Sequence, residues 1–256
     1  MKSATPKTEL PPSTQLRKTV FGGAHKHVMC LCILFGLGFA SVRPAFAATT
    51  NIFSTQFEAT EGYSTTINLV GQNGWLGFGS GGNGLVTNYL EGHGQQAFIG
   101  FFPPDQGDDQ LGVWRPINLA PVPTNMPVVQ FSVLMSIVDS SNTNYDDFYW
   151  SVYNEQGDSL FTLDFDNYNL RIYYLLDGTN DFVWTGKTFT NDDTNTLVIT
   201  MNFAQNSWAA TFDGVLLATN KAITTTGAPL NLGDVDAGWR VFDPAYPGDN
   251  YMVFDN

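Results

Sequence analysis

The amino-acid sequence predicts an all-β fold, an antiparallel sandwich or barrel built from short strands. After residue 48, short segments with apolar side chains at every second position recur, and residues typical of turns separate them. No segment in that part of the sequence has the 3.6-residue apolar repeat of an amphipathic helix. Regular short strands at this spacing favour a sandwich or barrel over alternating strands and helices.

Four of the predicted strands lie in the central third of the chain. Residues 131–137 and 160–166 both alternate, and residues 170–176 and 182–185 form two further strands joined at Asp177-Gly178. The two faces of residues 160–166 carry Phe161, Leu163 and Phe165 on one side and Thr162, Asp164 and Asp166 on the other.

Residues 196–219 give the clearest pattern, a meander of three strands. Apolar and polar side chains alternate through residues 196–203, and a polar turn leads into a strand that begins at Trp208. Asp213-Gly214 then predicts a type I′ hairpin turn, because both central residues of that turn need a positive φ. We expect Trp208 to fill the core.

Two segments interrupt the strand pattern. Residues 71–95 contain nine glycines together with Trp75, and we predict a surface loop there, with a loop that contacts a ligand as the alternative. Residues 116–127 contain four prolines and are expected to connect one sheet to the other.

The N-terminal residues 1–47 predict a signal peptide. A basic leader precedes a 15-residue apolar run, Val28 to Val42, and Ala45 and Ala47 match an A-x-A cleavage site. The run is shorter than the roughly 20 residues of a membrane-spanning helix, although a retained anchor is the alternative. We therefore expect a secreted, extracellular protein whose single domain covers residues 48–256.

Removal of residues 1–47 would change the charge and the cysteine content of the chain. Six of the 11 basic residues and one of the 24 acidic residues lie there. The remaining chain has five basic and 23 acidic residues, which gives a formal charge of −18. Such a protein would repel nucleic acid and acidic membranes, which bind clustered lysine and arginine. Cys30 and Cys32 also lie there, so the predicted domain has no disulfide and no thiol.

The sequence contains no recognisable catalytic motif, so no catalytic residue is predicted. A Ser-His-Asp triad would have to use His93, the single histidine after residue 47, and a G-x-S-x-G motif is absent from the sequence. Glycoside cleavage needs two carboxylates on one groove. Asp164 and Asp166 share a predicted strand face. Three roles are open for them: a catalytic pair, contacts to a ligand or metal, or solvated strand residues.

Acidic residues and aromatic rings are the two remaining signals of function. Several aspartates lie near predicted strand ends and favour calcium, which takes six to eight oxygen ligands; acidic turns without metal are the alternative. Aromatic side chains beside acidic acceptors suit a saccharide, whose rings present apolar C–H faces. Tyr149, Trp150 and Tyr173, with Asp164 and Asp166, are the candidate ligand-binding residues, and the core is the competing place for the three rings.

Four short motifs give the chain a family resemblance over residues 53–256. They are Phe57-Glu58, Gly74-Trp75, the hairpin from Trp208 to Asp213-Gly214, and the closing residues Asn250 to Asn256. In this order they resemble the concanavalin A-like, laminin-G-like jelly rolls of secreted bacterial proteins. The resemblance implies an antiparallel jelly-roll sandwich of two sheets, and a structural calcium held by Glu58 and Asp255.

The expected function follows from that resemblance and from the absence of a catalytic motif. We expect a non-catalytic module that binds polysaccharide or a glycosylated surface, with or without calcium. A structural or matrix protein of the cell surface is the first alternative, and a glycoside hydrolase or polysaccharide lyase with an unrecognised site is the second, because one architecture carries many functions.

Overall fold

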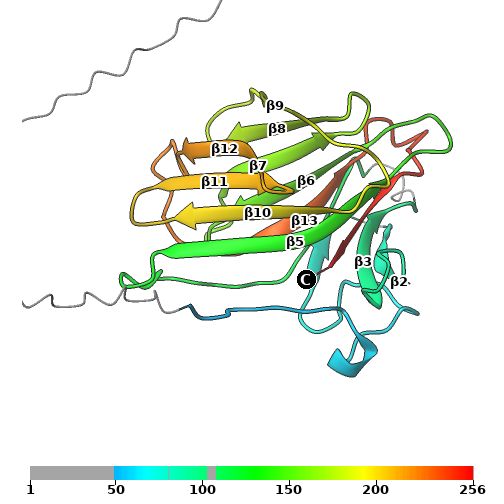
Figure 1. Cartoon of the computed structure of the whole chain (residues 1–256), viewed down its shortest axis with the longest axis horizontal. Coiled ribbons are helices and arrows are strands. Elements are labelled where there is room, and N and C mark those ends of the chain that lie inside the picture. Colours follow the sequence, from blue (N-terminus) through cyan, green and yellow to red (C-terminus); the bar gives the residue numbers. More distant parts are fainter. Residues whose placement is uncertain (1–48, 80, 103–107, 256) are drawn as a thin grey trace, which may run out of the picture. The chain divides into compact units, whose positions relative to one another are not determined.

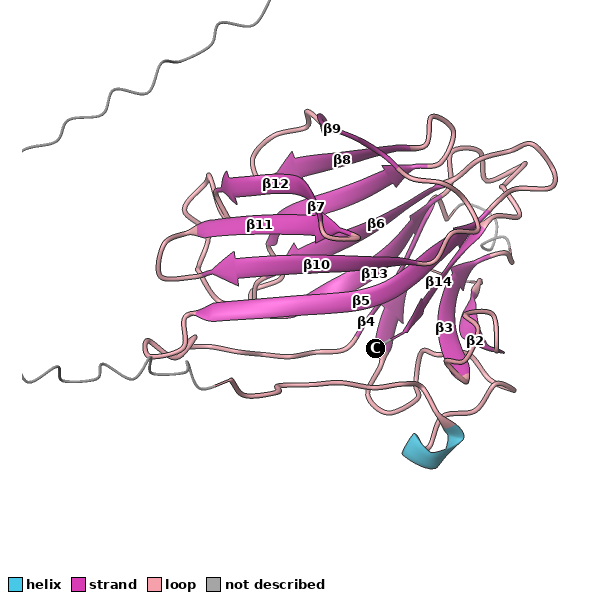
Figure 2. Cartoon of the chain, in the orientation of Figure 1, coloured by secondary structure: helices cyan, strands magenta, loops and turns pink. Residues whose placement is uncertain are grey.

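Fourteen strands in two antiparallel sheets make up nearly all the regular structure of the residues that the computed structural model describes, which are 49–79, 81–102 and 108–255. The two sheets stack face to face (Figure 1). One short 3₁₀ turn, η1 (Ala59–Glu61), is the only helix in these ranges (Figure 2). The predicted all-β sandwich is thus confirmed. The predicted signal peptide, residues 1–47, lies outside the described residues.

Sheet A has the strand order β1-β4-β13-β6-β7-β8-β9 and sheet B the order β12-β11-β10-β5-β14-β3-β2. The strands of sheet A are β1 (Leu76–Phe78), β4 (Gln110–Trp114), β13 (Asp234–Arg240), β6 (Asp147–Tyr153), β7 (Ser159–Asp166), β8 (Arg171–Leu176) and β9 (Val183–Thr188). The strands of sheet B are β12 (Val215–Lys221), β11 (Ser207–Phe212), β10 (Asn195–Asn202), β5 (Val128–Val138), β14 (Tyr251–Asp255), β3 (Gln95–Gly100) and β2 (Asn83–Thr87).

The core lies between the sheets and follows the predicted alternation. Phe161, Leu163 and Phe165 of β7 are all buried there. Trp208 of β11 in sheet B stacks on Phe161, with ring centroids 4.2 Å apart and an angle of 4° between the planes. Its side chain is 1% exposed, which confirms the core position predicted for it. A stacked pair of this kind ties the two sheets together.

The predicted meander is β10, β11 and β12. Asp213 and Gly214 connect β11 to β12 with φ angles of 49° and 73°, as a type I′ turn requires. The Asp213 carboxylate also accepts a hydrogen bond from the backbone N–H of Thr196. The proline-rich residues 116–127 join β4 of sheet A to β5 of sheet B, so the predicted crossing between sheets is confirmed.

The prediction of a surface loop over residues 71–95 is wrong in part. The segment contains β1 and β2, and Trp75 is buried in the core against Phe57 and Phe254. Glycines occur within these strands because neighbouring groups lie close against them. A Cβ at Gly84, for example, would come within 2.8 Å of the Phe98 ring. A glycine that receives a ring on an edge strand interrupts the alternation of side chains by which a strand is recognised.

The outermost strands are short or irregular. β1 has three residues and β2 has five. The register between β8 and β9 shifts at Ile172/Tyr173, and the register between β11 and β12 shifts twice between Trp208 and Thr211. Such shifts are β-bulges, which increase the local twist of an edge strand.

Candidate functional site

The face of sheet A that points away from the core carries four of the five candidate ligand-binding residues. Tyr149 of β6 is paired with Asp164 of β7, and Asp164 is paired with Tyr173 of β8, so the three side chains form a row across the sheet. Asp166 lies on the same face of β7, two residues along from Asp164. We call this surface the outer face of sheet A.

Trp150 points in the opposite direction, and the expectation that it contacts a ligand is corrected. Its side chain is 2% exposed and packs in the core against Phe131 and Phe254, with ring centroids 5.1 and 5.3 Å away. Neighbouring residues of a strand point to opposite faces. Because Tyr149 lies on the outer face, Trp150 must point inward.

Asp164 belongs to a charged cluster around Arg240 of β13. The guanidinium Nη1 lies 3.1 Å from Asp164 Oδ1 and 3.8 Å from Asp147 Oδ2. Burial raises the pKa of Asp164 to about 6, although the Arg240 charge opposes this rise. Burial and the nearby Asp164 charge raise the pKa of Asp147 to about 8. The guanidinium also lies 5.1 Å from the Phe182 ring centroid. The Asp164 carboxylate therefore already has an ion-pair partner within the protein.

Asp166 has a local role in the turn between β7 and β8. Its two carboxylate oxygens accept hydrogen bonds from the backbone N–H and the side-chain amide of Asn169, each at 2.8 Å. Asp164 and Asp166 thus share one strand face, as predicted, but each has partners of its own.

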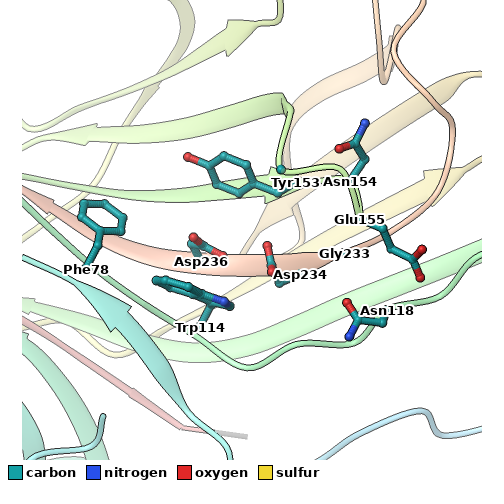
Figure 3. A pocket seen from close by; sticks show the side chains of 10 residues that line it. Phe78, Trp114, Asn118, Tyr153, Asn154, Glu155, Gly233, Asp234 and Asp236 are labelled. Atoms are coloured by element: carbon teal, nitrogen blue, oxygen red, sulfur yellow. The ribbon is translucent and has the colours of Figure 1, made fainter. Parts of the chain in front are cut away.

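The same face contains a groove at its other end, of about 330 Å³ (Figure 3). This volume is at the low end of the range of about 300–1,000 Å³ for small-molecule sites. The described residues that line it come from widely separated parts of the chain and are Phe78, Trp114, Asn118, Tyr153, Asn154, Glu155, Gly157, Gly233, Asp234 and Asp236.

Aromatic side chains form the walls of the groove. Phe78 of β1 and Trp114 of β4 lie side by side, with ring centroids 6.1 Å apart and planes at 41°, and Tyr153 of β6 lies across from them (Figure 3). The Phe78 ring lies on Gly112, because a Cβ there would come within 2.3 Å of it. The strand order places β1 and β4, which carry these two rings, on one side of β13 and β6, which carries Tyr153, on the other.

Gly238 of β13, which neighbours Gly112 in the sheet, contacts a second ring, that of Tyr149. Gly238 is paired with Gly112 in the register of β13 and β4. A Cβ at Gly238 would come within 2.0 Å of the Tyr149 ring, so that ring lies flat on the glycine. Two paired glycines therefore hold two rings against the sheet.

The floor of the groove is formed by two carboxyl groups of β13. Asp234 and Asp236 are two residues apart and project to the same side of the strand (Figure 3). Asp236 is 6% exposed, and its Oδ1 is buried without a hydrogen-bond partner among the described residues. Burial, together with repulsion between the two groups, raises the pKa of Asp236, and burial raises the pKa of Asp234.

The sequence did not predict this groove. Asp234 and Asp236 are two of the aspartates near predicted strand ends, where calcium was the expected ligand. One signal was present, because Asp234, Asp236, Gly238 and Arg240 alternate with apolar residues and so share one face of a strand. No local pattern connects that face with Phe78, Trp114 and Tyr153.

The two residues of the expected calcium site both reach residues 93–95. Oε1 of Glu58 accepts a hydrogen bond from the backbone N–H of Gln95 at 3.0 Å. Oδ2 of Asp255, at the end of β14, lies 3.6 Å from Nδ1 of His93. Two carboxylates supply part of the six to eight oxygens that calcium takes. Among the described residues, no three His, Cys, Asp or Glu side chains form a group that could hold a metal.

Other acidic loop residues bind the protein's own backbone. Asp146 accepts hydrogen bonds from the N–H groups of Phe242 and Gly248, and Asp249 accepts them from Ser141 and Asn142. These carboxylates hold loops in place, which is the alternative to calcium binding that the sequence left open.

The two sheets of seven strands define a concanavalin A-like jelly-roll sandwich. Among solved structures, the chain is similar to a protein described as a sialidase, with a TM-score of 0.50 and 10% identity over 72% of this chain. The chain spans 16% of the length of that sialidase. It also resembles lectin II from Ulex europaeus, with a TM-score of 0.46 and 11% identity, over 74% of this chain and 96% of the lectin.

A third similar structure is the carbohydrate-binding module CBM66 from Bacillus subtilis, with a TM-score of 0.40 and 10% identity, over 72% of this chain and 92% of the module. At these identities the likeness concerns the fold. No protein-family model and no curated protein sequence matches the chain. Within the described ranges, no helix has the length and apolar character to cross a membrane.

Proposed function

We propose that this chain is a secreted, non-catalytic carbohydrate-binding or adhesion protein, and that it binds polysaccharide or a glycosylated surface in the groove on the outer face of sheet A. The observation that supports this function is the composition of the groove, with aromatic walls above a carboxyl floor. Apolar C–H faces of a sugar pack on aromatic rings, and its hydroxyl groups donate hydrogen bonds to carboxylates.

The rings are fixed before any ligand arrives, which favours binding. Phe78 is held by close contact with Gly112, and Trp114 packs beside it. A ring already in its bound position loses little conformational entropy on binding.

A binding screen of the purified protein against a broad polysaccharide panel tests the proposal. We expect retention by at least one glycan without release of reducing ends or unsaturated products. Trp114→Ala should weaken this binding by about tenfold or more, because truncation of a central aromatic residue typically removes 2 kcal/mol or more. Phe102→Ala, an exposed aromatic residue at the end of β3 in sheet B, is the matched control and should bind as the unmodified protein does.

Three outcomes would count against the proposal. Failure to bind any glycan would favour a structural or matrix role. Product release would reveal an enzyme. Equal loss of binding in the two variants would place the contact elsewhere.

Calcium and secretion are separate parts of the proposal. The resemblance favours Glu58 and Asp255 as calcium ligands, so the screen is run both in calcium and in chelator. Glu58→Gln should abolish any difference between the two buffers. Secretion rests on the basic leader and apolar run of residues 1–47, and N-terminal sequencing of the exported protein should begin at Ala48.

A further inference from the structure

A buried carboxyl oxygen without a hydrogen-bond donor lies at the floor of the groove. Oδ1 of Asp236 accepts no hydrogen bond from the described residues, and the residue is only 6% exposed. A buried polar atom without a partner costs about 1–3 kcal/mol, and more when it is charged. A ligand that turns the Asp236 carboxyl group toward the groove and donates a hydrogen bond to it would remove this cost, which an exposed carboxylate does not carry.

The charge around this oxygen is negative. Asp234 lies two residues away on the same face, and Glu155 lines the same groove. The described lining residues include no lysine, arginine or histidine. An anionic ligand is disfavoured beside these acidic groups, whereas a cationic ligand can replace the proton that the raised pKa values leave on Asp234 and Asp236 at neutral pH.

The walls restrict what kind of cation can bind. Phe78, Trp114 and Tyr153 line the groove around the two aspartates (Figure 3). Asn154 already uses its side-chain oxygen for the N–H groups of Gln156 and Asp158. A calcium ion needs six to eight oxygens, whereas an organic ammonium needs two or three acceptors and an apolar surface beside it.

We propose that the groove selects a glycan with free primary amines, in which the ammonium of an amino sugar donates hydrogen bonds to Asp236 and Asp234 while the sugar ring packs on Trp114 and Phe78. This inference rests on the proposed function, since it names the class of sugar for the same groove. Burial raises the pKa of both carboxyl groups, and burial with repulsion from Asp234 raises that of Asp236 to about 9, so the pair holds a proton at neutral pH that the ammonium must displace when it binds.

The test compares three oligosaccharides of one linkage and length by isothermal titration calorimetry with the purified protein. They are β-1,4-linked hexamers of glucosamine, N-acetylglucosamine and glucose. We expect the glucosamine hexamer to bind about tenfold tighter or more than the other two, since a hydrogen bond to a charged group contributes about 1.5–3 kcal/mol.

Two variants separate a specific contact from general attraction to an acidic protein. Asp236→Asn keeps the shape of the side chain but removes its charge, and should reduce the preference for the glucosamine hexamer to about twofold or less. Asp193→Asn removes the same charge from an exposed position after β9 and should leave the preference unchanged. Urea unfolding of both variants verifies that they are folded.

The outcomes distinguish this inference from the function on which it rests. If the neutral hexamers bind as tightly as the glucosamine hexamer, carbohydrate binding stands and the amine preference is overturned. If no hexamer and no polysaccharide of the wider screen binds, both fail. Equal effects of the two variants would overturn the inference, and so would equally tight binding of polylysine, since the site would then recognise a cation without its sugar.

Discussion

Replacement of Trp208 by alanine should remove much of the stability of the sandwich. The side chain is almost fully buried between the sheets, and truncation of such a residue costs about 3–5 kcal/mol. The stack on Phe161 adds about 0.5–1.5 kcal/mol. The indole N–H also donates a hydrogen bond to the backbone oxygen of Ala222 at 3.0 Å, and its loss adds about 1 kcal/mol. These contributions overlap, because the cost of truncation already includes part of the lost stacking, so we expect a total of about 5 kcal/mol.

Urea unfolding followed by circular dichroism measures this loss. With a slope of about 2 kcal/mol per molar urea, a loss of about 5 kcal/mol lowers the midpoint by about 2.5 M. Trp184→Ala is the matched control. Trp184 is 50% exposed and contacts Arg171 from 5.1 Å, so its removal should cost about 1 kcal/mol or less.

The reasoning is refuted if Trp208→Ala shifts the midpoint no further than Trp184→Ala does. Should the alanine variant not fold at all, Trp208→Phe gives the finer measurement. That variant keeps a ring against Phe161 but cannot donate to Ala222, so a loss of about 1–3 kcal/mol is expected.

Three further predictions concern sheet A and its turns. Gly238→Ala should force the Tyr149 ring off the sheet at a cost of about 1–3 kcal/mol, seen as a changed near-ultraviolet circular dichroism spectrum; an unchanged spectrum would contradict the described contact. Asp147 keeps its proton up to a pKa of about 8 when folded and loses it near its ordinary value when unfolded, so its share of stability falls between about pH 4 and pH 8. Asp147→Asn should flatten that fall in urea titrations at several pH values, while persistence of the full slope would assign it to other groups such as Asp164. Hydrogen bonds from three threonines lower the pKa of Asp177 to about 2, so Asp177→Asn should destabilise the protein above about pH 4 and have a smaller effect at pH 2, with equal losses at both pH values speaking against this role.

Alternation along single strands was enough to predict which side chains fill the core. Phe161, Leu163 and Phe165 face inward as predicted, and Asp213-Gly214 forms the predicted turn, because both features depend on residues adjacent in sequence. The face of Trp150 could not be decided in the same way. Tyr149 and Trp150 are both aromatic, and only the pairing of Tyr149 with Asp164 determines which of them points outward.

The groove depends on contacts that no short segment encodes. Its walls and floor come from β1, β4, β6 and β13, which lie far apart in sequence but close together in one sheet. Asp234 and Asp236, two residues apart on β13, line it together with rings from three other strands. Asp164 illustrates the same difficulty, since its partner Arg240 lies 76 residues away.

The irregular outermost strands bear on how the protein behaves at high concentration. An unpaired strand of regular geometry is a template to which a second copy can add, and repeated addition leads to fibrils. Here β1 has only three residues, while β9 and β12 have register shifts and carry the charged residues Lys187 and Lys221. Three of the four outermost strands therefore disfavour the addition of a second copy through backbone hydrogen bonds.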